Sequence, residues 1–211
     1  MKDTYLSTKR DGSMNEKENI IRYLKNNNID PEKFVRGGLV HGKEVEIVDN
    51  DDAGKVIKGV DGLITTKKLS LGVTVADCLP VYIRSSQITG ILHCGWKSLY
   101  KGIIKEAIQK IEKIGEDSEN LSVYVGPSIK VCHFEVKKDL MEKFSKYQNC
   151  FEIRDGKTFL SLQKVLKQKF NKHGVRGVNL SDKCTYCNKE LFSYRRDNKL
   201  NNMLAVIKPT K

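Results

Sequence analysis

The stretch from residue 59 to residue 95 constrains the fold most strongly, because it contains β-type runs in immediate succession. These runs are "GVDGLITT", "LSLGVTVADC", "LPVYIRSS" and "ITGILHCG". Glycines, Pro80 and polar pairs separate the runs, which is typical of short strands ended by turns. A chain that contains this block must build a sheet, and the apolar content of the runs indicates that much of the sheet is buried.

Helical patterns flank this block on both sides. "NEKENIIRYLKNNNIDPEKF" predicts a short helix that ends at the asparagine run and Pro31, and "SLYKGIIKEAIQKIEKIG" predicts one long helix that stops at Gly115. Further helical patterns cover 136–147 and 159–172, and "GLVHGKEVEIV" and "LSVYVGP" have strand character. "GVNLSDKCTYC" and "LAVIKP" close the chain. No repeat or linker divides the chain. We therefore predict an α/β fold, a layered sandwich of mixed β-sheets flanked by helices, as a single domain over residues 1–211.

Composition narrows the class of protein. A hydrophobic fraction of 39% with 30% charged residues is typical of a soluble globular chain. No apolar run approaches the ~20 residues that span a bilayer, and the first residues lack the apolar stretch of a secretion signal. We expect a cytoplasmic protein with no membrane partner, in which the six cysteines are thiols rather than disulfides.

The formal net charge of +12 does not by itself name a partner. The lysines are spread along the whole chain, often at helix-face spacing, and no nucleic-acid module accompanies them. Solvated helix faces explain most of this charge, and a weak field that attracts phosphate is the alternative. We expect no nucleic-acid partner.

Two histidines and one cysteine are the leading candidates for chemistry. His41 and His93 lie beside glycines in strand-like runs, and Cys78 ends a third run. Two imidazoles and a thiolate suit a borderline-soft cation such as zinc, and three protein ligands leave a fourth position for water or substrate. A cation in such a site lowers the pKa of bound water to about 7.

Spacing alone leaves other interpretations open. His41 and His93 are equally consistent with satisfied core histidines, and Cys78 with a buried filler. Cys78 is also a candidate nucleophile, with a histidine as its base and Asp77 or another acid as the group that orients that base. Both the metal-site and the nucleophile hypotheses require a histidine close to the sulfur.

Other motifs are less specific. Arg195 and Arg196, in "LFSYRRDN", form a fork that suits phosphate or a carboxylate, or else close a strand through a salt bridge. Glu135 is a candidate acid or base. "CTYC" has the spacing of half a zinc ribbon, but the chain lacks a second CxxC, so Cys184 and Cys187 are interpreted as structural or incidental. His133 and His173 are interpreted as fillers.

Several of these segments occur in the order seen in one known family. "VHG" (40–42), "DGLIT" (61–65), "ADCLPV" (76–81), "HCGW" (93–96), "GPSI" (126–129), "FEV" (134–136), "CT" (184–185) and "FSYRRD" (192–197) make the chain resemble the YfiH-like laccase-domain family. Members are also called multicopper polyphenol oxidases and purine nucleoside phosphorylases. The N-terminal region is shorter than in the family, and Cys94 stands where the family usually has alanine.

The resemblance implies an α/β sandwich with a zinc ion held by His41, Cys78 and His93. It also implies phosphate-dependent cleavage of the N-glycosidic bond of adenosine, inosine, guanosine and methylthioadenosine, with adenosine deaminase activity. In that case purine nucleoside and phosphate are the small-molecule partners.

Residue roles follow from this implied reaction. Asp77 or Glu135 would carry a proton, and Arg195 or Arg196 would hold phosphate. Trp96 would cover a base or simply pack. The helix expected to start near Ser98 would direct its positive end toward the site.

Two other activities also follow from the resemblance. One is a copper-dependent polyphenol oxidase (laccase), for which four histidines are few. The other is a Cys78-dependent hydrolase that edits peptidoglycan precursors. A basic binding module is the alternative without catalysis.

Overall fold

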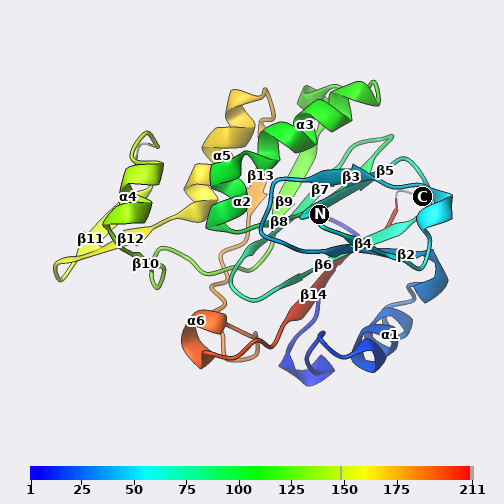
Figure 1. Cartoon of the computed structure of the whole chain (residues 1–211), viewed down its shortest axis with the longest axis horizontal. Coiled ribbons are helices and arrows are strands. Elements are labelled where there is room, and N and C mark those ends of the chain that lie inside the picture. Colours follow the sequence, from blue (N-terminus) through cyan, green and yellow to red (C-terminus); the bar gives the residue numbers. More distant parts are fainter. Residues whose placement is uncertain (148, 210–211) are drawn as a thin grey trace.

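A computed structural model of the chain describes residues 1–147 and 149–209. Its main body has four layers, in the order helix, five-stranded sheet, six-stranded sheet and helices (Figure 1). The predicted layered α/β sandwich of mixed sheets flanked by helices is confirmed.

The six-stranded sheet has the order β13-β9-β7-β8-β5-β3. Its strands are β3 (Val45–Ile47), β5 (Gly62–Thr65), β7 (Leu79–Arg84), β8 (Thr89–Cys94), β9 (Ser122–Val125) and β13 (Gly177–Leu180). The central strands pair antiparallel, whereas β13 with β9 and β3 with β5 pair parallel. The sheet is therefore mixed, and β8 lies near its middle.

The five-stranded sheet has the order β1-β14-β6-β2-β4. Its strands are β1 (Thr4–Leu6), β2 (Phe34–Gly38), β4 (Val56–Lys58), β6 (Ser70–Val75) and β14 (Met203–Ile207). The chain leaves this sheet after β2, after β4 and after β6 to enter the other one. These crossings become important below, because each carries one residue of the candidate site.

Helices cover the outer faces of the sheets. Helix α1 (Lys17–Asn26) covers the five-stranded sheet, whereas α2 (Trp96–Lys101), α3 (Ile103–Lys113) and α5 (Leu162–Lys172) cover the six-stranded sheet. A small sheet, β10 (Glu135–Val136), β12 (Lys157–Leu160) and β11 (Phe151–Arg154), lies to one side with α4 (Lys138–Phe144), and α6 (Tyr194–Asp197) lies near β14.

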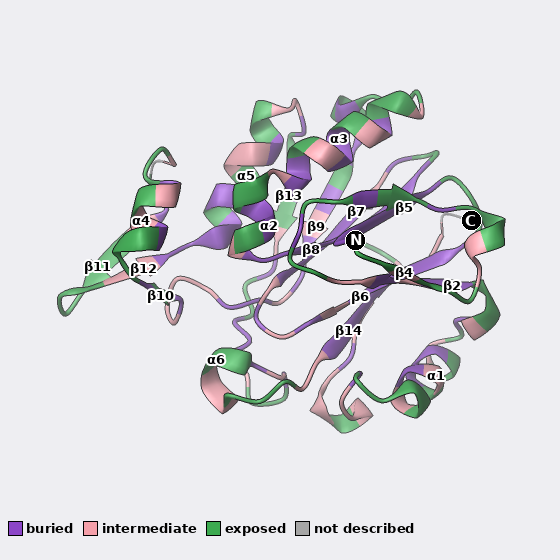
Figure 2. Cartoon of the chain, viewed as in Figure 1, coloured by how far each residue is buried: buried purple, intermediate pink, exposed green. Residues whose placement is uncertain are grey.

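Alternating side chains divide the apolar residues between two cores. In β7, Val81 faces the helices and Tyr82 faces the opposite sheet; in β8, Leu92 and Ile91 divide in the same way. The middle strands are therefore buried on both faces, as the purple ribbons of Figure 2 show. This accounts for the nearly continuous apolar runs in the sequence.

Two sequence-based expectations need correction. The long helix predicted from "SLYKGIIKEAIQKIEKIG" is broken into α2 and α3 at Gly102, whose φ of 100° is outside the helical region. The apolar stripe continues across the break, which concealed it. The helical pattern predicted from residue 159 starts only at Leu162, because Asp155 and Gly156 form a hairpin turn with φ of 49° and 71° between β11 and β12.

Over the described residues, no helix is both long enough and apolar enough to cross a membrane.

Candidate metal centre and cavity

His41, Cys78 and His93 reach one point from three parts of the fold. His41 lies in the loop between β2 and β3, Cys78 in the turn between β6 and β7, and His93 on β8. Their potential ligand atoms all lie within 4.8 Å of one another. The two imidazole rings meet edge to face, with centroids 4.8 Å apart and an interplanar angle of 86°. The expectation that His41 lies in a strand is wrong, since residues 39–44 form a loop.

Asp61 explains why that loop keeps its shape. Its fully buried carboxylate accepts the backbone N–H groups of Val40 (3.1 Å), His41 (3.0 Å) and Gly42 (2.7 Å). These bonds stabilise a φ of 54° at His41, which is unusual for a residue other than glycine. One buried side chain therefore fixes the backbone that carries the first histidine.

The same carboxylate also orients the second histidine. The Oδ1 atom of Asp61 lies 2.8 Å from Nδ1 of His93, and the Asp61 carbonyl accepts the His93 backbone N–H at 2.7 Å. Nε2 is therefore the ring nitrogen left for a metal ion. A carboxylate behind a histidine is a common arrangement in metal sites, because it fixes the tautomer and raises the basicity of the ligand.

The charges of the site suit a cation. Burial alone would raise the pKa of the Cys78 thiol, but the charge on His93 and hydrogen bonds from both histidines outweigh it and lower this pKa to about 6. Burial would lower the pKa of His93, but the Cys78 thiolate and Asp61 raise it to about 9. Without metal the pair is thus a thiolate and an imidazolium, and the thiolate is available as a ligand at neutral pH.

Gly95 keeps the space in front of the sulfur open. A Cβ atom at this position would lie 2.9 Å from Sγ of Cys78 and 3.6 Å from the His41 ring. The backbone at Gly95 is extended, with φ of −86°, so glycine is needed here for close approach rather than for a tight turn. Helix α2 follows directly at Trp96, two residues earlier than expected.

The three residues line one side of a cavity of about 650 Å³. The wall also includes aromatic and cationic side chains, namely Trp96, Phe134, Tyr194, Arg36, Lys97 and Arg195. This volume is in the range of small-molecule sites.

Comparison with known proteins places this geometry in a family. The profile of the family described as "Multi-copper polyphenol oxidoreductase laccase" matches residues 6–209. The chain belongs to this family. The resemblance drawn from the sequence motifs is thereby confirmed.

Curated and solved relatives of this laccase family agree. A protein of Aquifex aeolicus named purine nucleoside phosphorylase is 34% identical over 78% of this chain and 77% of its own length. A purine nucleoside phosphorylase of Clostridium acetobutylicum is 35% identical over 77% and 72%, respectively. The crystal structure of hypothetical protein YfiH from Bacillus licheniformis has a TM-score of 0.85 and 26% identity, covering 92% of this chain and 80% of that chain.

The two acids predicted to carry a proton, Asp77 and Glu135, have different surroundings in this laccase-family site. Asp77 lines the cavity, but its oxygens accept Oγ1–H of Thr185 (2.6 Å) and the backbone N–H of Arg195 (2.7 Å). It therefore ties the C-terminal segment to the turn that carries Cys78. Glu135 pairs with Lys157 at 3.5 Å and is not among the residues that line the cavity.

The two neighbouring arginines have different surroundings. The guanidinium of Arg196 donates to the carbonyls of Thr185, Tyr186, Asn188 and Leu191 and to the carboxylate of Asp197. All of its directions are thus occupied by the protein. Arg195 is exposed, lies over the Phe134 ring at 5.3 Å and lines the cavity. Its Nη1 donates to the carbonyls of His133 (3.4 Å) and Glu135 (3.2 Å), so its guanidinium is engaged at one nitrogen rather than on all sides.

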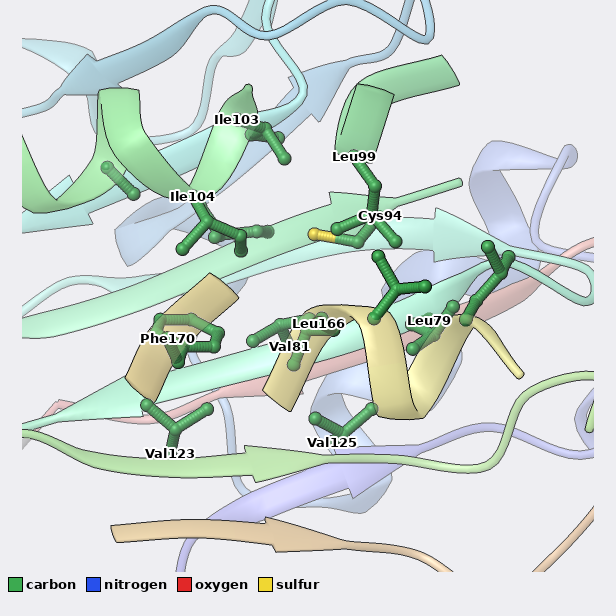
Figure 3. Packing of buried hydrophobic residues seen from close by; sticks show 14 of the residues in the cluster. Leu79, Val81, Cys94, Leu99, Ile103, Ile104, Val123, Val125, Leu166 and Phe170 are labelled. Atoms are coloured by element: carbon green, nitrogen blue, oxygen red, sulfur yellow. The ribbon is translucent and has the colours of Figure 1, made fainter. Parts of the chain in front are cut away.

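Cys94 lies outside the cavity although it follows His93 directly. Its side chain is fully buried in the core between β8 and the helices, beside Leu99 and Ile104 (Figure 3). Burial raises the pKa of this thiol well above its usual value. Because side chains alternate along a strand, the neighbour of a site residue on β8 must face the core.

Sequence reasoning missed two residues of this site. Asp61 stands at the start of the quoted "DGLIT" motif, and an acid directly before a buried strand was the available signal. Arg36 gave no signal, because it lies in β2 before the first recognised motif, "VHG", and belongs to none of the motifs. Its half-buried guanidinium lines the cavity without a hydrogen-bond or ion-pair partner among the described side chains, and burial lowers its pKa.

Proposed function

We propose that the protein is a zinc-dependent purine nucleoside phosphorylase that acts on adenosine, inosine, guanosine and methylthioadenosine and also deaminates adenosine. The observation that carries this proposal is the position of His41, Cys78 and His93 on the wall of a cavity that is also lined by two arginines, Arg36 and Arg195. The names of the relatives from Aquifex aeolicus and Clostridium acetobutylicum support the same activity.

The donor set favours zinc as the resident metal. Two imidazoles and one thiolate lie within 4.8 Å of one another, and the carboxylate behind His93 orients the ring so that Nε2 faces the other ligands. Zinc, when bound, supplies a Lewis acid with one position open to water or substrate. The copper oxidase alternative is less well supported, because the four histidines do not gather in one place: only His41 and His93 are together.

The cavity walls suit a nucleoside and an anion. In phosphorolysis, a phosphate oxygen forms a bond to C1′ of the ribose while the N-glycosidic bond breaks, so that ribose 1-phosphate and the protonated purine leave. We assign phosphate binding to Arg36 and Arg195, since Arg196 is fully engaged by the protein. Trp96, Phe134 and Tyr194 offer apolar surface to the base.

Deamination requires a different exchange in the same cavity. The oxygen of water replaces the amino group at C6 of adenine, and ammonia leaves, so that adenosine becomes inosine. Asp77 acts here as a positioning residue, because both of its oxygens are already hydrogen-bonded to the C-terminal segment.

The test of the proposed function is a product analysis. Zinc-loaded protein is incubated with adenosine or inosine, with and without phosphate, and the products are separated by chromatography. We expect adenine and hypoxanthine to appear only with phosphate, and inosine to appear from adenosine without it. Intact nucleosides in all reactions would refute the proposal.

The role of Arg36 gives a second prediction. Arg36→Gln removes the cation and keeps much of the side-chain volume. Because a hydrogen bond to a charged group contributes about 1.5–3 kcal/mol, we expect KM for phosphate to rise about 10-fold or more. KM for inosine should change little. Initial rates at varied phosphate measure this. Arg176→Gln, at an exposed position outside the cavity, is the matched control. An unchanged phosphate KM in Arg36→Gln would exclude the assignment.

One observation favours a second candidate, a thiol-dependent hydrolase acting on peptidoglycan precursors. Asp61, His93 and Cys78 form a row of acid, imidazole and thiolate, which is also the order of a nucleophilic site. Cys78→Asp separates the two hypotheses, because a carboxylate replaces a thiolate as zinc ligand but not as this nucleophile. If Cys78→Asp retains zinc and residual phosphorolysis, the metal enzyme is supported. If the wild type hydrolyses the precursor and Cys78→Asp does not, the hydrolase is supported.

A further inference from the structure

A second group of soft ligands lies outside the cavity. Cys132 and His133 come from the segment between β9 and β10, and Cys184 and Cys187 from the segment between β13 and α6. The potential ligand atoms of all four residues lie within 4.8 Å of one another. None of the four lines the cavity or belongs to the group of His41, Cys78 and His93.

The distances within this group fit a tetrahedral cation. Sγ of Cys132 and Sγ of Cys187 are 3.8 Å apart, and Nδ1 of His133 lies 3.2 Å from the first sulfur and 3.3 Å from the second. Ligands at ~2.3 Å from zinc place two sulfurs ~3.8 Å apart at the corners of a tetrahedron. A disulfide would instead require about 2.05 Å.

The surrounding backbone holds the ligands in place. The backbone N–H groups of Lys130, Tyr186 and Cys187, which come from both segments, lie close enough to the sulfur of Cys184 to favour its thiolate. The His133 ring stacks on the Tyr186 ring, with centroids 3.9 Å apart and an interplanar angle of 17°. The plane of the imidazole is therefore fixed by the residue that lies between the two cysteines of "CTYC".

Further contacts join the two segments beside the cluster. Ser128 and Cys184 form a parallel β-bridge, and the N–H of Thr185 donates to the carbonyl of Ser128 at 3.1 Å. Arg196 adds bonds to the carbonyls of Thr185 and Tyr186. A set of three sulfurs and one imidazole supported in this way fits a structural zinc site, in which all four positions are filled by protein.

We propose that Cys132, His133, Cys184 and Cys187 bind a second, structural zinc ion. Its role is to cross-link the segment between β9 and β10 to the segment between β13 and α6, both of which lie next to the cavity. Thr185, next to one ligand, donates to Asp77, the neighbour of Cys78, and the carbonyl of His133 accepts a hydrogen bond from Arg195 at 3.4 Å. The second zinc thus stabilises the wall that carries Arg195 without touching substrate.

This site was not recognised in the sequence because its two pairs of ligands have different spacing. "CTYC" is half of a ribbon, and its partner is the adjacent pair Cys132 and His133 rather than a second CxxC. The interpretation of Cys184 and Cys187 as structural or incidental, and of His133 as a filler, rested on the absence of that second motif.

Metal content tests the proposal. Protein produced with zinc, freed of loose metal by a weak chelator and gel filtration, is analysed by mass spectrometry for zinc per chain. We expect two zinc ions in the wild type, one in Cys187→Ser, one in His93→Ala and none in the double variant. Cys187 is exposed, so its substitution leaves the core intact. Cys150→Ser, at a buried cysteine outside both groups, is the control and retains two.

Cobalt provides an independent readout of the thiolate ligands, and its main measurement is made on the wild type. Titration of metal-free wild type with Co²⁺ is expected to give strong thiolate-to-cobalt charge-transfer absorption, because three sulfurs bind at one site, and most of this absorption is absent in Cys187→Ser. Failure of the proposed enzyme function would leave these results unchanged. Equal zinc content in the wild type and Cys187→Ser, weak cobalt absorption, or a Cys132–Cys187 disulfide under reducing conditions would overturn the proposal.

Discussion

His93→Ala is expected to lower phosphate-dependent release of purine by more than about 100-fold and to remove one zinc ion per chain. The substitution deletes a ligand, and it also leaves the buried Asp61 carboxylate without its imidazole partner. Loss of a ligand should exceed the 10–100-fold effect that is typical when only a supporting residue of a metal site is changed. Initial rates with inosine and phosphate, together with zinc analysis of the same preparation, measure both effects.

His173→Ala is the matched control for this prediction. His173 belongs to neither ligand group, and its hydrogen bonds with Ser118 and with Phe170 of α5 are made by its backbone. We expect this variant to retain its activity and both zinc ions. The site proposed at Cys132, His133, Cys184 and Cys187 should keep its metal in His93→Ala. A count of one zinc ion per chain therefore also shows that this variant has folded. Wild-type activity in His93→Ala would refute the metal centre.

Asp61→Asn is expected to lower both stability and activity. One carboxylate oxygen accepts the N–H groups of Val40 and Gly42, and the other accepts those of His41 and His93. An amide can present oxygen to only one of these pairs, so its NH₂ group must face two donors in a fully buried site. We expect a loss of about 3 kcal/mol in the free energy of unfolding and a 10–100-fold fall in kcat/KM.

Urea unfolding and initial rates measure the Asp61→Asn effects, and Asp182→Asn, at an exposed carboxylate, is the control. The pH dependence has a defined sign. Burial would raise the pKa of Asp61, but His93 and the loop N–H groups lower it below its unfolded value near 3.9. The stability advantage of the wild type is therefore complete above about pH 4 and falls as the pH drops through the folded-state pKa. An advantage that grows on acidification would contradict this account.

Much of the fold was predictable because the strands repeat a local pattern. The runs that contain β5, β6, β7 and β8 are apolar and end at glycines, Pro80 or polar pairs, so each was visible in the sequence. Gly102 was not recognised as a helix break, because Ile103 and Ile104 continue the apolar stripe on its far side. The turn at Asp155 and Gly156 carried a hairpin signal that the helical pattern after it obscured.

The sequence by itself determined the layered α/β architecture, the family, and the three residues His41, Cys78 and His93 as candidates. These follow from local periodicity and from short motifs, which need no knowledge of distant contacts. Only the tertiary structure decided how the residues work together: that Asp61 holds both histidines, that Arg195 lines the cavity while Arg196 is engaged by the protein, and that Cys132 and His133 lie beside the "CTYC" cysteines. The physical reason is that each of these contacts joins segments that are far apart along the chain, and such contacts produce no periodic pattern in the sequence. The hydrogen-bonding groups that a side chain keeps free also depend on which neighbours the fold places beside it.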